Sequence, residues 1–531
     1  MKKQIVITLI LIIITAFVTV VYFKNLNAPG MRTSQVMHAI PDNASLIFEF
    51  NNDKSFYDIF SGNKLFASIA GQQKLDELDI LRRQLMENPI LDKYFAEQNI
   101  YVSVHPSKTN NIELLLTVSS ANGFELSILD QLSKTHNSGM VITPLRLQGK
   151  QGYNIYVNAL KKRFYVINKE SNIFLGSFSK ELIEQCSVYK SPDNKPAYAL
   201  LSEKQNANSL ANLYINYSEL SPLFDQLFKN KNTDIVKTLK LLPGLAVLAL
   251  NYRSDALMFN GSTNILRNAG SQYLNLFTGQ QPVINHLKDI FPSTMAYSTS
   301  FAVSDPLKFV ADLSEWQNTT GLKGEKNALL SKIKTETGIS LRTEFNNLLG
   351  NEFAVITTRY FEKFAVVTVS DGSKLKLLLS AISTMTNENT GQLNYDKLPF
   401  FLLGDAFSVF KRPYFIIIDN YLVFANSAGE LLSYNDIYVN RKFLSKNSQY
   451  NQFDNLLAEK SNVAFLFNFK NLEPVLERDM YPGVYNEVKN KTPGWKNFYA
   501  ASVQFTALDK NFNTNFCIRL NTDTINVTKS K

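Results

Sequence analysis

The feature that most constrains the fold of this chain is a phrase that occurs twice. Residues 40–50 read IPDNASLIFEF, and residues 290–301 read IFPSTMAYSTSF. Each copy has a proline, a short polar turn and then apolar residues at alternate positions, which is the period of a β-strand with one buried face. Pro41 aligns with Pro292, so the copies lie 251 residues apart. Any fold for this chain must place the same local structure at two distant points.

The match continues further along the chain at the same spacing. Residues 99–120 and residues 351–371 each predict two strands around a polar turn. Thr117 aligns with Thr368, again at a separation of 251 residues. A chance resemblance would lose its spacing over this distance, whereas this one keeps it.

A third pair of segments follows in the same order. Residues 163–185 and residues 413–434 each predict a tight hairpin that leads into a helix. Because the matches keep their order and nearly their spacing, the sequence predicts a tandem duplication of a unit of roughly 230 residues.

We expect each half to have an α+β fold built on mainly antiparallel sheets packed by helices. The predicted strands come in adjacent pairs with helices between the groups, not in strict alternation with helices. Phe and Tyr alternate with polar residues, as in sheets with one face against helices and one wetter face. The predicted organisation is an N-terminal anchor (1–28), a first α+β repeat (29–266), a connecting segment (267–288), a second α+β repeat (289–520) and a flexible tail (521–531).

The N-terminal segment predicts one transmembrane helix. The run from Ile5 to Phe23 is apolar and uncharged, and about 20 such residues span a bilayer core. A cleaved signal peptide ends in small residues, whereas here Ala28 is followed by Pro29, so we expect an uncleaved signal anchor. Lys2 and Lys3 precede the run and favour an N-terminus that stays inside.

This orientation predicts a single-pass protein of the cytoplasmic (inner) membrane, with the bulk of its chain in the periplasm. Lys24 and Arg32 lie on the far side of the apolar run and partly offset the N-terminal lysines. A chain that faces the cytoplasm is therefore the alternative topology.

The charge of the chain gives little reason to expect a nucleic-acid partner. The formal net charge is +9, and part of it belongs to the predicted anchor. Basic residues are scattered, and only Lys161, Lys162 and Arg163 form a tight cluster. Proteins that bind nucleic acid gather such residues on one face or along one helix, so we predict no nucleic-acid binding.

Cys186 and Cys517 are the only cysteines. Two thiols in a chain of 531 residues make no disulfide framework, and they form no CxxC motif. Their apolar neighbours indicate that both side chains are buried and act as small hydrophobic groups.

No catalytic motif is evident in the sequence. The only histidines are His38, His105, His136 and His286, and no two of them have metal-ligand spacing. We expect each of them at a surface or in a turn. Nucleophile elbows, phosphate-binding glycine loops and HExxH helices are also missing from the sequence. We therefore predict no catalytic, cofactor-binding or metal-binding residue and no cofactor.

Two short patterns have structural explanations that we prefer. The SKIK stretch at 331–334 has the SxxK spacing of a serine nucleophile and its lysine, but the companion SDN and KTG elements are missing. We expect a solvated helix face there. The acids of the DELD stretch at 76–79 are expected to face water beside Arg82 and Arg83 on an amphipathic helix.

Polar residues that occur in both halves also favour structural roles. Asn216 and Asn468 each follow a predicted strand and precede a helix, where a side-chain amide can bond to the turning backbone. Glu181 and Glu430 open equivalent predicted helices, beside the positive end of the helix dipole.

The chain resembles the bacterial envelope proteins catalogued as domain of unknown function 3352. The resemblance rests on the anchor, on the IPDNASLIFEF opening, on GISLRTEFNNLLGNEFAVI at 338–356 and on the layout in two halves, and it covers most of residues 38–520. The resemblance implies an extracytoplasmic protein. The family has no established catalytic residues to transfer onto this sequence, so the resemblance leaves the activity open.

The leading functional prediction is a membrane-anchored extracytoplasmic binding or scaffold protein of the envelope. The anchor from Ile5 to Phe23 makes the membrane one partner, and an envelope protein or lipid is the other. The first alternative is a carrier of lipid or another apolar ligand, because a Phe-rich sheet under amphipathic helices can open into a cavity. An enzyme of unrecognised class is the second alternative, and the oligomeric state is left open.

Overall fold

The structure is a computed structural model that describes residues 31–521 with gaps. The predicted anchor and nearly all of the predicted tail lie outside these residues. Inside the range, the residues left out are 55, 58–64, 66–67, 69–71, 107–111, 121–123, 134–138, 171, 193–208, 231–236, 238–241, 243, 266–271 and 491–494.

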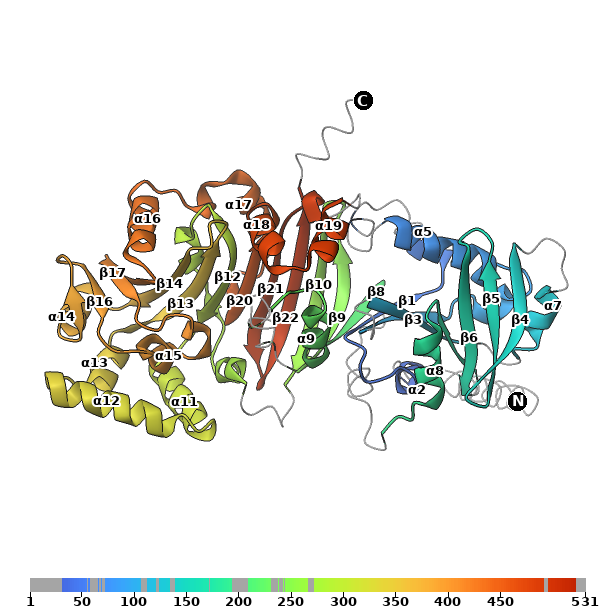
Figure 1. Cartoon of the computed structure of the whole chain (residues 1–531), viewed down its shortest axis with the longest axis horizontal. Helices are drawn as coiled ribbons and strands as arrows, with labels where there is room; N and C mark the ends of the chain where they lie inside the picture. The colour runs from blue at the N-terminus through green and yellow to red at the C-terminus, as the bar shows by residue number, and fades with distance from the viewer. Residues whose placement is uncertain are drawn as a thin grey trace, which may run out of the picture.

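The described part of the chain has an α+β fold around one sheet of 20 strands (Figure 1). Every pairing within this sheet is antiparallel. The expectation of an α+β fold with antiparallel strands is therefore confirmed. A small second sheet pairs β11 (Val283–Ile284) with β19 (Lys460–Ser461).

The hydrogen-bonded neighbours define the order of the strands from each outer edge to the centre. In the N-terminal half they are β4 (Met140–Leu147), β5 (Lys150–Val157), β6 (Lys162–Glu170), β7 (Ile173–Ser177), β3 (Ile112–Ser119), β2 (Asn99–Pro106), β1 (Leu46–Asn51), β8 (Ala211–Asn216), β9 (Leu245–Tyr252) and β10 (Ala256–Asn264).

In the C-terminal half they are β15 (Ser383–Met385), β16 (Thr390–Leu393), β17 (Tyr414–Ile418), β18 (Tyr421–Ala425), β14 (Lys363–Val369), β13 (Leu349–Thr358), β12 (Met295–Ala302), β20 (Val463–Asn468), β21 (Phe498–Leu508) and β22 (Asn511–Leu520). β11 and β19 belong to the small second sheet. When the remaining ten strands of each half are numbered along the chain, both halves have the same strand order in the sheet.

The two halves meet through a strand pair that we call the seam, β10 with β22. Its cross-strand partners run from Ala256 with Arg519 to Thr263 with Phe512. The seam lies near the centre of the elongated molecule (Figure 1). Backbone hydrogen bonds therefore continue from one half into the other.

Each face of the N-terminal half is covered by its own helices. Ile47, Tyr101 and Tyr214 pack against α2 (Met31–Ala39), and Leu115 and Leu175 pack against α8 (Lys180–Val188). The opposite face packs against the helices α5 (Gln72–Leu81), α6 (Asp92–Phe95) and α7 (Ile128–Ser133), together with the π-helical turn η1 (Arg82–Met86).

The C-terminal half is layered in the same way. Ala354 and Ile356 face α16 (Ala428–Val439), α17 (Ser448–Asp454) and the short turns η5 (Leu287–Ile290) and η7 (Leu444–Lys446). Phe353 faces the other way, into the largest apolar cluster. The helices on that side are α11 (Pro306–Thr319), α12 (Lys323–Thr337), α13 (Leu341–Asn346), α14 (Gly372–Ser380) and α15 (Leu398–Leu403).

The largest apolar cluster crosses the seam. Its members come from both halves, and the rings of Tyr217 and Phe505 lie edge to face with centroids 6.0 Å apart. Tyr217 opens α9 (Tyr217–Asp225), and the matching helix of the other half is α18 (Phe469–Asp479), which is followed by α19 (Pro482–Asn490). A core shared across the seam stabilises the two halves as one body.

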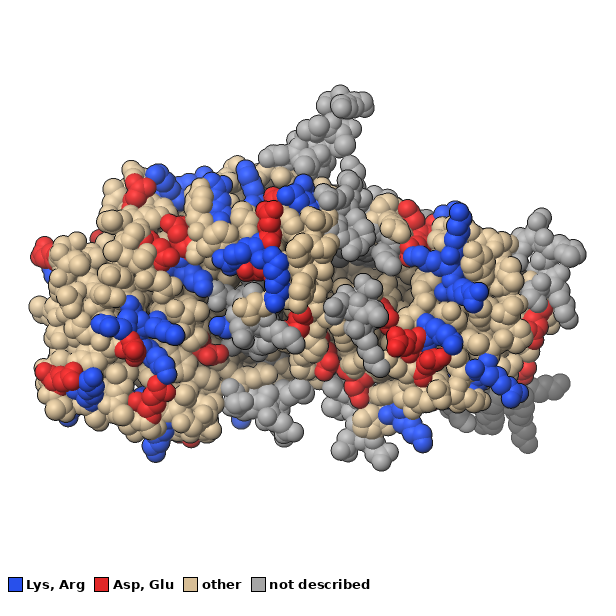
Figure 2. Space-filling view, in the orientation of Figure 1, with Lys and Arg blue, Asp and Glu red and all other residues tan. Residues whose placement is uncertain are grey.

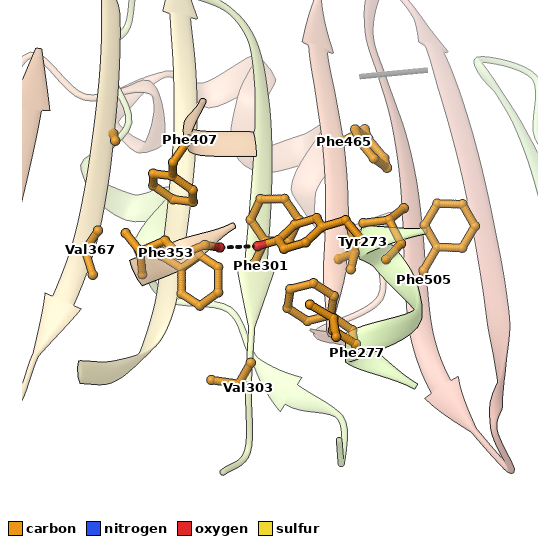
Figure 3. Packing of buried hydrophobic residues seen from close by; sticks show 14 of the residues in the cluster. Tyr273, Phe277, Phe301, Val303, Phe353, Val367, Phe407, Phe465 and Phe505 are labelled. Atoms are coloured by element: carbon orange, nitrogen blue, oxygen red, sulfur yellow. Dashed lines mark hydrogen bonds between the residues drawn. The ribbon is translucent and has the colours of Figure 1, made fainter. Parts of the chain in front are cut away.

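Part of the predicted connecting segment is core. The turn η4 (Tyr273–Phe277) is buried, and Figure 3 shows Tyr273 and Phe277 beside Phe301 and Phe353. The ring centroids of Tyr273 and Phe277 lie 5.5 Å and 5.1 Å from that of Phe301. The hydroxyl of Tyr273 donates to the carbonyl of Leu403. This segment therefore packs inside the C-terminal half as well as joining the halves.

Candidate functional site

The N-terminal half buries a carboxylate within its sheet. Glu49, on β1, is 1% exposed. Its Oε1 accepts hydrogen bonds from the hydroxyl of Tyr101 at 2.7 Å and the amide of Asn99 at 2.8 Å, both on β2. Its Oε2 accepts from the hydroxyl of Tyr214 at 2.7 Å and the amide of Asn212 at 3.4 Å, both on β8. We call these five residues the Glu49 cluster.

The Glu49 cluster suits a structural role better than a catalytic one. Burial, and then the carboxylate of Glu49, raise the pKa of Tyr214 well above its usual value. The tyrosine therefore keeps its proton and continues to donate. A buried carboxylate is tolerated when donors surround it, and here the donors come from the strands on both sides of β1. The cluster links the side chains of these three strands by hydrogen bonds.

The equivalent place in the C-terminal half has smaller side chains. Glu49 is the cross-strand partner of Tyr101 and Asn212. In the same positions of the other half, Ser300 is the partner of Ala354 and Ala464. Leu466 correspondingly takes the place of Tyr214. Here the sheet lacks the bulk and the donors of Tyr101, Tyr214 and Asn212, whereas Glu352 takes the place of Asn99.

In the C-terminal half, a small cavity lies at the place that corresponds to the Glu49 cluster. Its volume is about 30 Å³, and Ser300, Glu352, Tyr450, Ser502 and Gln504 contribute to its lining. A water molecule needs roughly 10–15 Å³ of such space and two to four polar neighbours. The cavity thus has room for a bound water, and it is too small for a lipid chain.

Most of the cavity lining is apolar, but polar and charged side chains also contribute to it. Glu352 is 8% exposed, and its Oε2 accepts from the backbone N–H groups of His286 and Leu287, both at 2.9 Å. Burial raises the pKa of Glu352, and these two hydrogen bonds oppose the rise. The hydroxyl of Tyr450 is buried with no hydrogen-bond partner among the described residues. A bound water would satisfy it.

Asparagines occupy the centre of the seam on the same face of the sheet. Asn260 and Asn515 are cross-strand partners, and the amide of Asn260 donates to the side-chain oxygen of Asn515. The amide of Asn251 donates to Asn260 at 3.1 Å. Asn251, Asn260 and Asn513 are exposed. The seam therefore presents amide groups to solvent between the two buried sites.

A single row of cross-strand partners joins the Glu49 cluster, the seam and the cavity. The row consists of Glu49, Asn212, Ala249, Asn260, Asn515, Gln504, Ala464 and Ser300. All of these side chains lie on one face, because direct partners in an antiparallel pair point to the same side. The row is polar at six of its eight positions, unlike the apolar opposite face.

The histidines do not form a site. His105 is buried, so the prediction of a surface or turn position is wrong for it; its ring nitrogens bond to Ser103 and Asn43, both at 2.8 Å. Burial lowers the pKa of His105 to about 4. His286 is exposed directly before η5, which agrees with the predicted surface position. The described part of the chain contains no group of three His, Cys, Asp or Glu residues that could hold a metal.

His38 lies in the last turn of α2, and its ring bonds to the hydroxyl of Ser191 at 2.9 Å. His136 lies outside the described residues. Cys186 and Cys517 are both buried free thiols, as predicted, and burial raises the pKa of each to about 12. Such thiols stay protonated at neutral pH and are poor nucleophiles.

The two short patterns differ in outcome. In the SKIK stretch, Ser331 and Lys334 are exposed on α12, which confirms a solvated helix face. In the DELD stretch, Asp79 pairs with arginines as expected. Glu77 contradicts the prediction, because it is buried and forms an ion pair of 2.5 Å with Lys162. That lysine lies on β6, so helical periodicity alone gave no sign of it.

The predicted structural roles of the repeated polar residues are confirmed. Asn216 caps α9 by accepting from the backbone of Ser218, and Asn468 caps α18 by accepting from that of Asn471. Glu181 and Glu430 lie in the first turns of α8 and α16. Capping satisfies backbone N–H groups that a helix leaves free at its start.

Charged side chains of both signs are interleaved over the viewed face of the molecule (Figure 2). This mixture agrees with the scattered basic residues of the sequence. In the described residues, no helix is both long and apolar enough to cross a membrane. The segment from Ile5 to Phe23 lies outside them.

Comparisons with known proteins add little. No family model matches the chain, and no curated protein matches it. Among solved structures, crystal form I of TP0453 is 14% identical over 47% of this chain and 87% of that chain, with a TM-score of 0.22. Crystal form III is 12% identical over 47% and 88%, with a TM-score of 0.23. Scores this low carry no argument about fold or function.

Sequence reasoning missed the Glu49 cluster, although its central residue lies in the phrase that predicts the repeat. In LIFEF, Glu49 follows Phe48 and precedes Phe50, so its side chain must point to the face opposite the phenylalanines. An acid in the middle of an apolar strand is a signal for a buried polar cluster. Its donors could not be found this way, because they lie 50 to 165 residues away.

Proposed function

We propose that this chain is a membrane-anchored, extracytoplasmic protein of the bacterial envelope that binds or scaffolds another envelope component. The apolar run from Ile5 to Phe23 supports a membrane anchor, and the resemblance to the envelope family supports an extracytoplasmic location. The observation that carries the binding role is the seam, where a sheet that spans both halves presents exposed asparagines at its centre.

The proposal includes the origin of the two halves by tandem duplication. The shared strand order supports it, and so does the pairing at the seam. The β9–β10 and β21–β22 hairpins place Asn260 and Asn515 at equivalent positions, and these two residues pair with each other. A contact between equivalent residues is what a two-fold axis produces. The seam is thus a pseudo-two-fold interface within one chain.

The seam suits recognition of a polar partner. Asn260 and Asn513 on the seam, and Asn251 on the neighbouring strand β9, are exposed and offer both donors and acceptors. Interfaces between domains or repeats are common binding sites. The acids on the same face are already engaged, since Glu49 and Glu352 each accept hydrogen bonds from surrounding donors. This favours binding over catalysis.

The test is site-specific photo-crosslinking in intact cells, followed by mass spectrometry. A photoreactive residue at Asn260 should capture a defined envelope component. The matched control is Leu377 on α14, which is 74% exposed and far from the seam in the fold. Capture of the same proteins from both positions, or of none from Asn260, would contradict the binding role.

The same preparation tests the carrier alternative. A carrier needs an apolar cavity of several hundred Å³, whereas the cavity beside Ser300 holds about 30 Å³. We expect solvent extraction of the purified full chain to release no stoichiometric lipid. One lipid per chain, retained through purification, would favour the carrier instead.

The cellular location can be tested by examining the N-terminal anchor. We expect a mature N-terminus at or near Met1, retention in membranes after a carbonate wash, and digestion by protease added to spheroplasts. Protection from protease until lysis would contradict the periplasmic orientation. A mature N-terminus after Ala28 would show a cleaved signal peptide.

A further inference from the structure

Two basic side chains converge on one hydroxyl in the helical layer of the C-terminal half. Lys326, on α12, is 6% exposed, and its Nζ donates to the hydroxyl of Ser314 on α11 at 3.0 Å. The guanidinium of Arg342, on α13, donates to the same hydroxyl at 3.3 Å. Three helices thus bring two cations to a single neutral acceptor.

Neither cation has an acidic partner among the described residues. The neighbouring acids of α12 are engaged elsewhere, since Glu325 pairs with Lys397 at 2.6 Å and Glu336 with Lys332 at 3.9 Å. Buried cations are usually paired or hydrogen-bonded to several acceptors. Lys326 has one neutral acceptor and a second cation beside it.

This arrangement is electrostatically unfavourable without an anion. Burial, and then the charge of Arg342, lower the pKa of Lys326 to about 8. Ser314 contributes no charge from α11, and Arg342 is the charged group that acts on Lys326 from α13. An anion placed between the two cations would replace their repulsion with two charge-assisted hydrogen bonds.

We propose that Lys326, Arg342 and Ser314 form a binding site for a single phosphate group. A guanidinium matches the oxygens of a phosphate in a bidentate way, an ammonium adds a compact charge, and a hydroxyl can donate a third hydrogen bond. Arg342 is exposed, so the site opens to solvent on that side. The phosphate is either free or part of a lipid head group. This inference is independent of the proposed function.

The experiment uses the full chain in detergent and titrates inorganic phosphate by calorimetry at pH 7. We expect saturable binding at one site. Arg342→Gln removes a charge from an exposed position and should weaken binding at least about tenfold, equal to the loss of one strong charge-assisted contact. Lys326→Met should weaken it at least as much. The matched control is Lys334→Met, which removes an exposed lysine of the same helix and should change affinity less than about twofold.

Binding should also weaken as the pH rises from 7 to 9, because Lys326 loses its charge near pH 8. In Lys326→Met, this weakening should disappear, which leaves only the pH dependence that comes from the second ionisation of phosphate itself. The exposed Arg342→Gln variant keeps the test decisive if Lys326→Met fails to fold. No saturable phosphate binding in the wild type, or equal affinity in the wild type and Arg342→Gln, would overturn a site for free phosphate.

A second arm distinguishes the source of the phosphate. The full chain is reconstituted into phosphatidylcholine nanodiscs with and without phosphatidylglycerol, and inorganic phosphate is titrated into both. Weaker binding of inorganic phosphate in the presence of phosphatidylglycerol would indicate that a lipid head group competes for the site, and equal binding in both nanodiscs would indicate a soluble ligand. Failure of both arms overturns the proposal.

Discussion

The Glu49 cluster and the cavity beside Ser300 occupy equivalent places in two similar half-sheets, yet they are built in opposite ways. The first fills its place with a carboxylate and four donors. The second has Ser300, Ala354 and Ala464 at the matching positions and is left partly empty. One backbone arrangement can therefore be stabilised by a hydrogen-bonded polar cluster around a carboxylate or by largely apolar packing around a water-sized cavity.

The difference shows which parts of this fold depend on side-chain identity. The strand order is the same around both places, so it does not require the Glu49 cluster. Within the N-terminal half, however, removing one member leaves buried donors unpaired, which is more costly than the absence of the whole cluster. The N-terminal half should be the more sensitive of the two to substitution.

The largest effect is expected from Glu49→Ala. It removes the acceptor shared by Tyr101 and Tyr214, and each buried donor left unpaired costs about 1–3 kcal/mol. We expect a loss of about 3–5 kcal/mol in the free energy of unfolding, measured by urea denaturation. The matched variant Ser300→Ala should cost less than about 1 kcal/mol. Equal losses in both variants would show that the two places are not built differently.

The next effect is a pH dependence carried by the N-terminal half. The pKa of His105 is about 4 in the folded chain and about 6.5 when unfolded. As the pH falls from about 6.5 to 4, the unfolded chain takes up this proton first, so stability falls by about 1.4 kcal/mol per pH unit within that window. Above it, the contribution of His105 is constant.

The C-terminal half offers a comparison for this pH dependence. The residue of β13 that corresponds to His105 is Thr358, which does not titrate in this range. His105→Gln should therefore reduce the slope of stability against pH between 4 and 6.5. An unchanged slope in this variant would assign the pH dependence to other groups.

A smaller loss is expected from Tyr214→Phe, which removes one donor to Glu49 and keeps the ring. A hydrogen bond to a charged group contributes about 1.5–3 kcal/mol, and denaturation should show a loss of that size. Combined with Glu49→Ala, the two losses should be less than additive, because both remove the same contact. Full additivity would mean that the two side chains do not interact.

The smallest effect is expected at the cavity. If a water bonds to the buried hydroxyl of Tyr450, Tyr450→Phe should cost about 0.5–1.5 kcal/mol, the usual net value of a hydrogen bond. Thermal or urea denaturation of the full chain gives the value. A neutral or stabilising change would indicate a dry cavity and an unpaired hydroxyl.

Local features of the fold could be predicted from the sequence because they depend on near neighbours. Asn216 and Asn468 follow strands and precede helices, and both are helix caps in the structure. Alternation places Phe48 and Phe50 on one face of β1 and Glu49 on the other. The α+β class follows from the same patterns.

Long-range features could not be predicted in this way. The pairing of Asn260 with Asn515 depends on hydrogen bonds between strands 255 residues apart. The burial of Tyr273 depends on contacts with Phe301 and Leu403, which the sequence of a connecting segment does not reveal.

Strand register was also beyond the sequence alignment. The sequence alignment matches Thr117 with Thr368. In the structure, Thr117 on β3 pairs with the β6–β7 hairpin at the place where Val366 on β14 pairs with the equivalent β17–β18 hairpin, so Val366 is the true counterpart of Thr117. A shift of two residues keeps the same side chains on the same face, so alternation cannot detect it.

Amide hydrogen exchange at the seam shows whether the two halves form one continuous sheet. We expect the amides of β10 between Ala256 and Thr263, and those of β22 between Phe512 and Arg519, to exchange as slowly as the amides of the flanking strands β9 and β21. Rapid exchange in β10 and β22, with β9 and β21 still protected, would instead show two separate sheets.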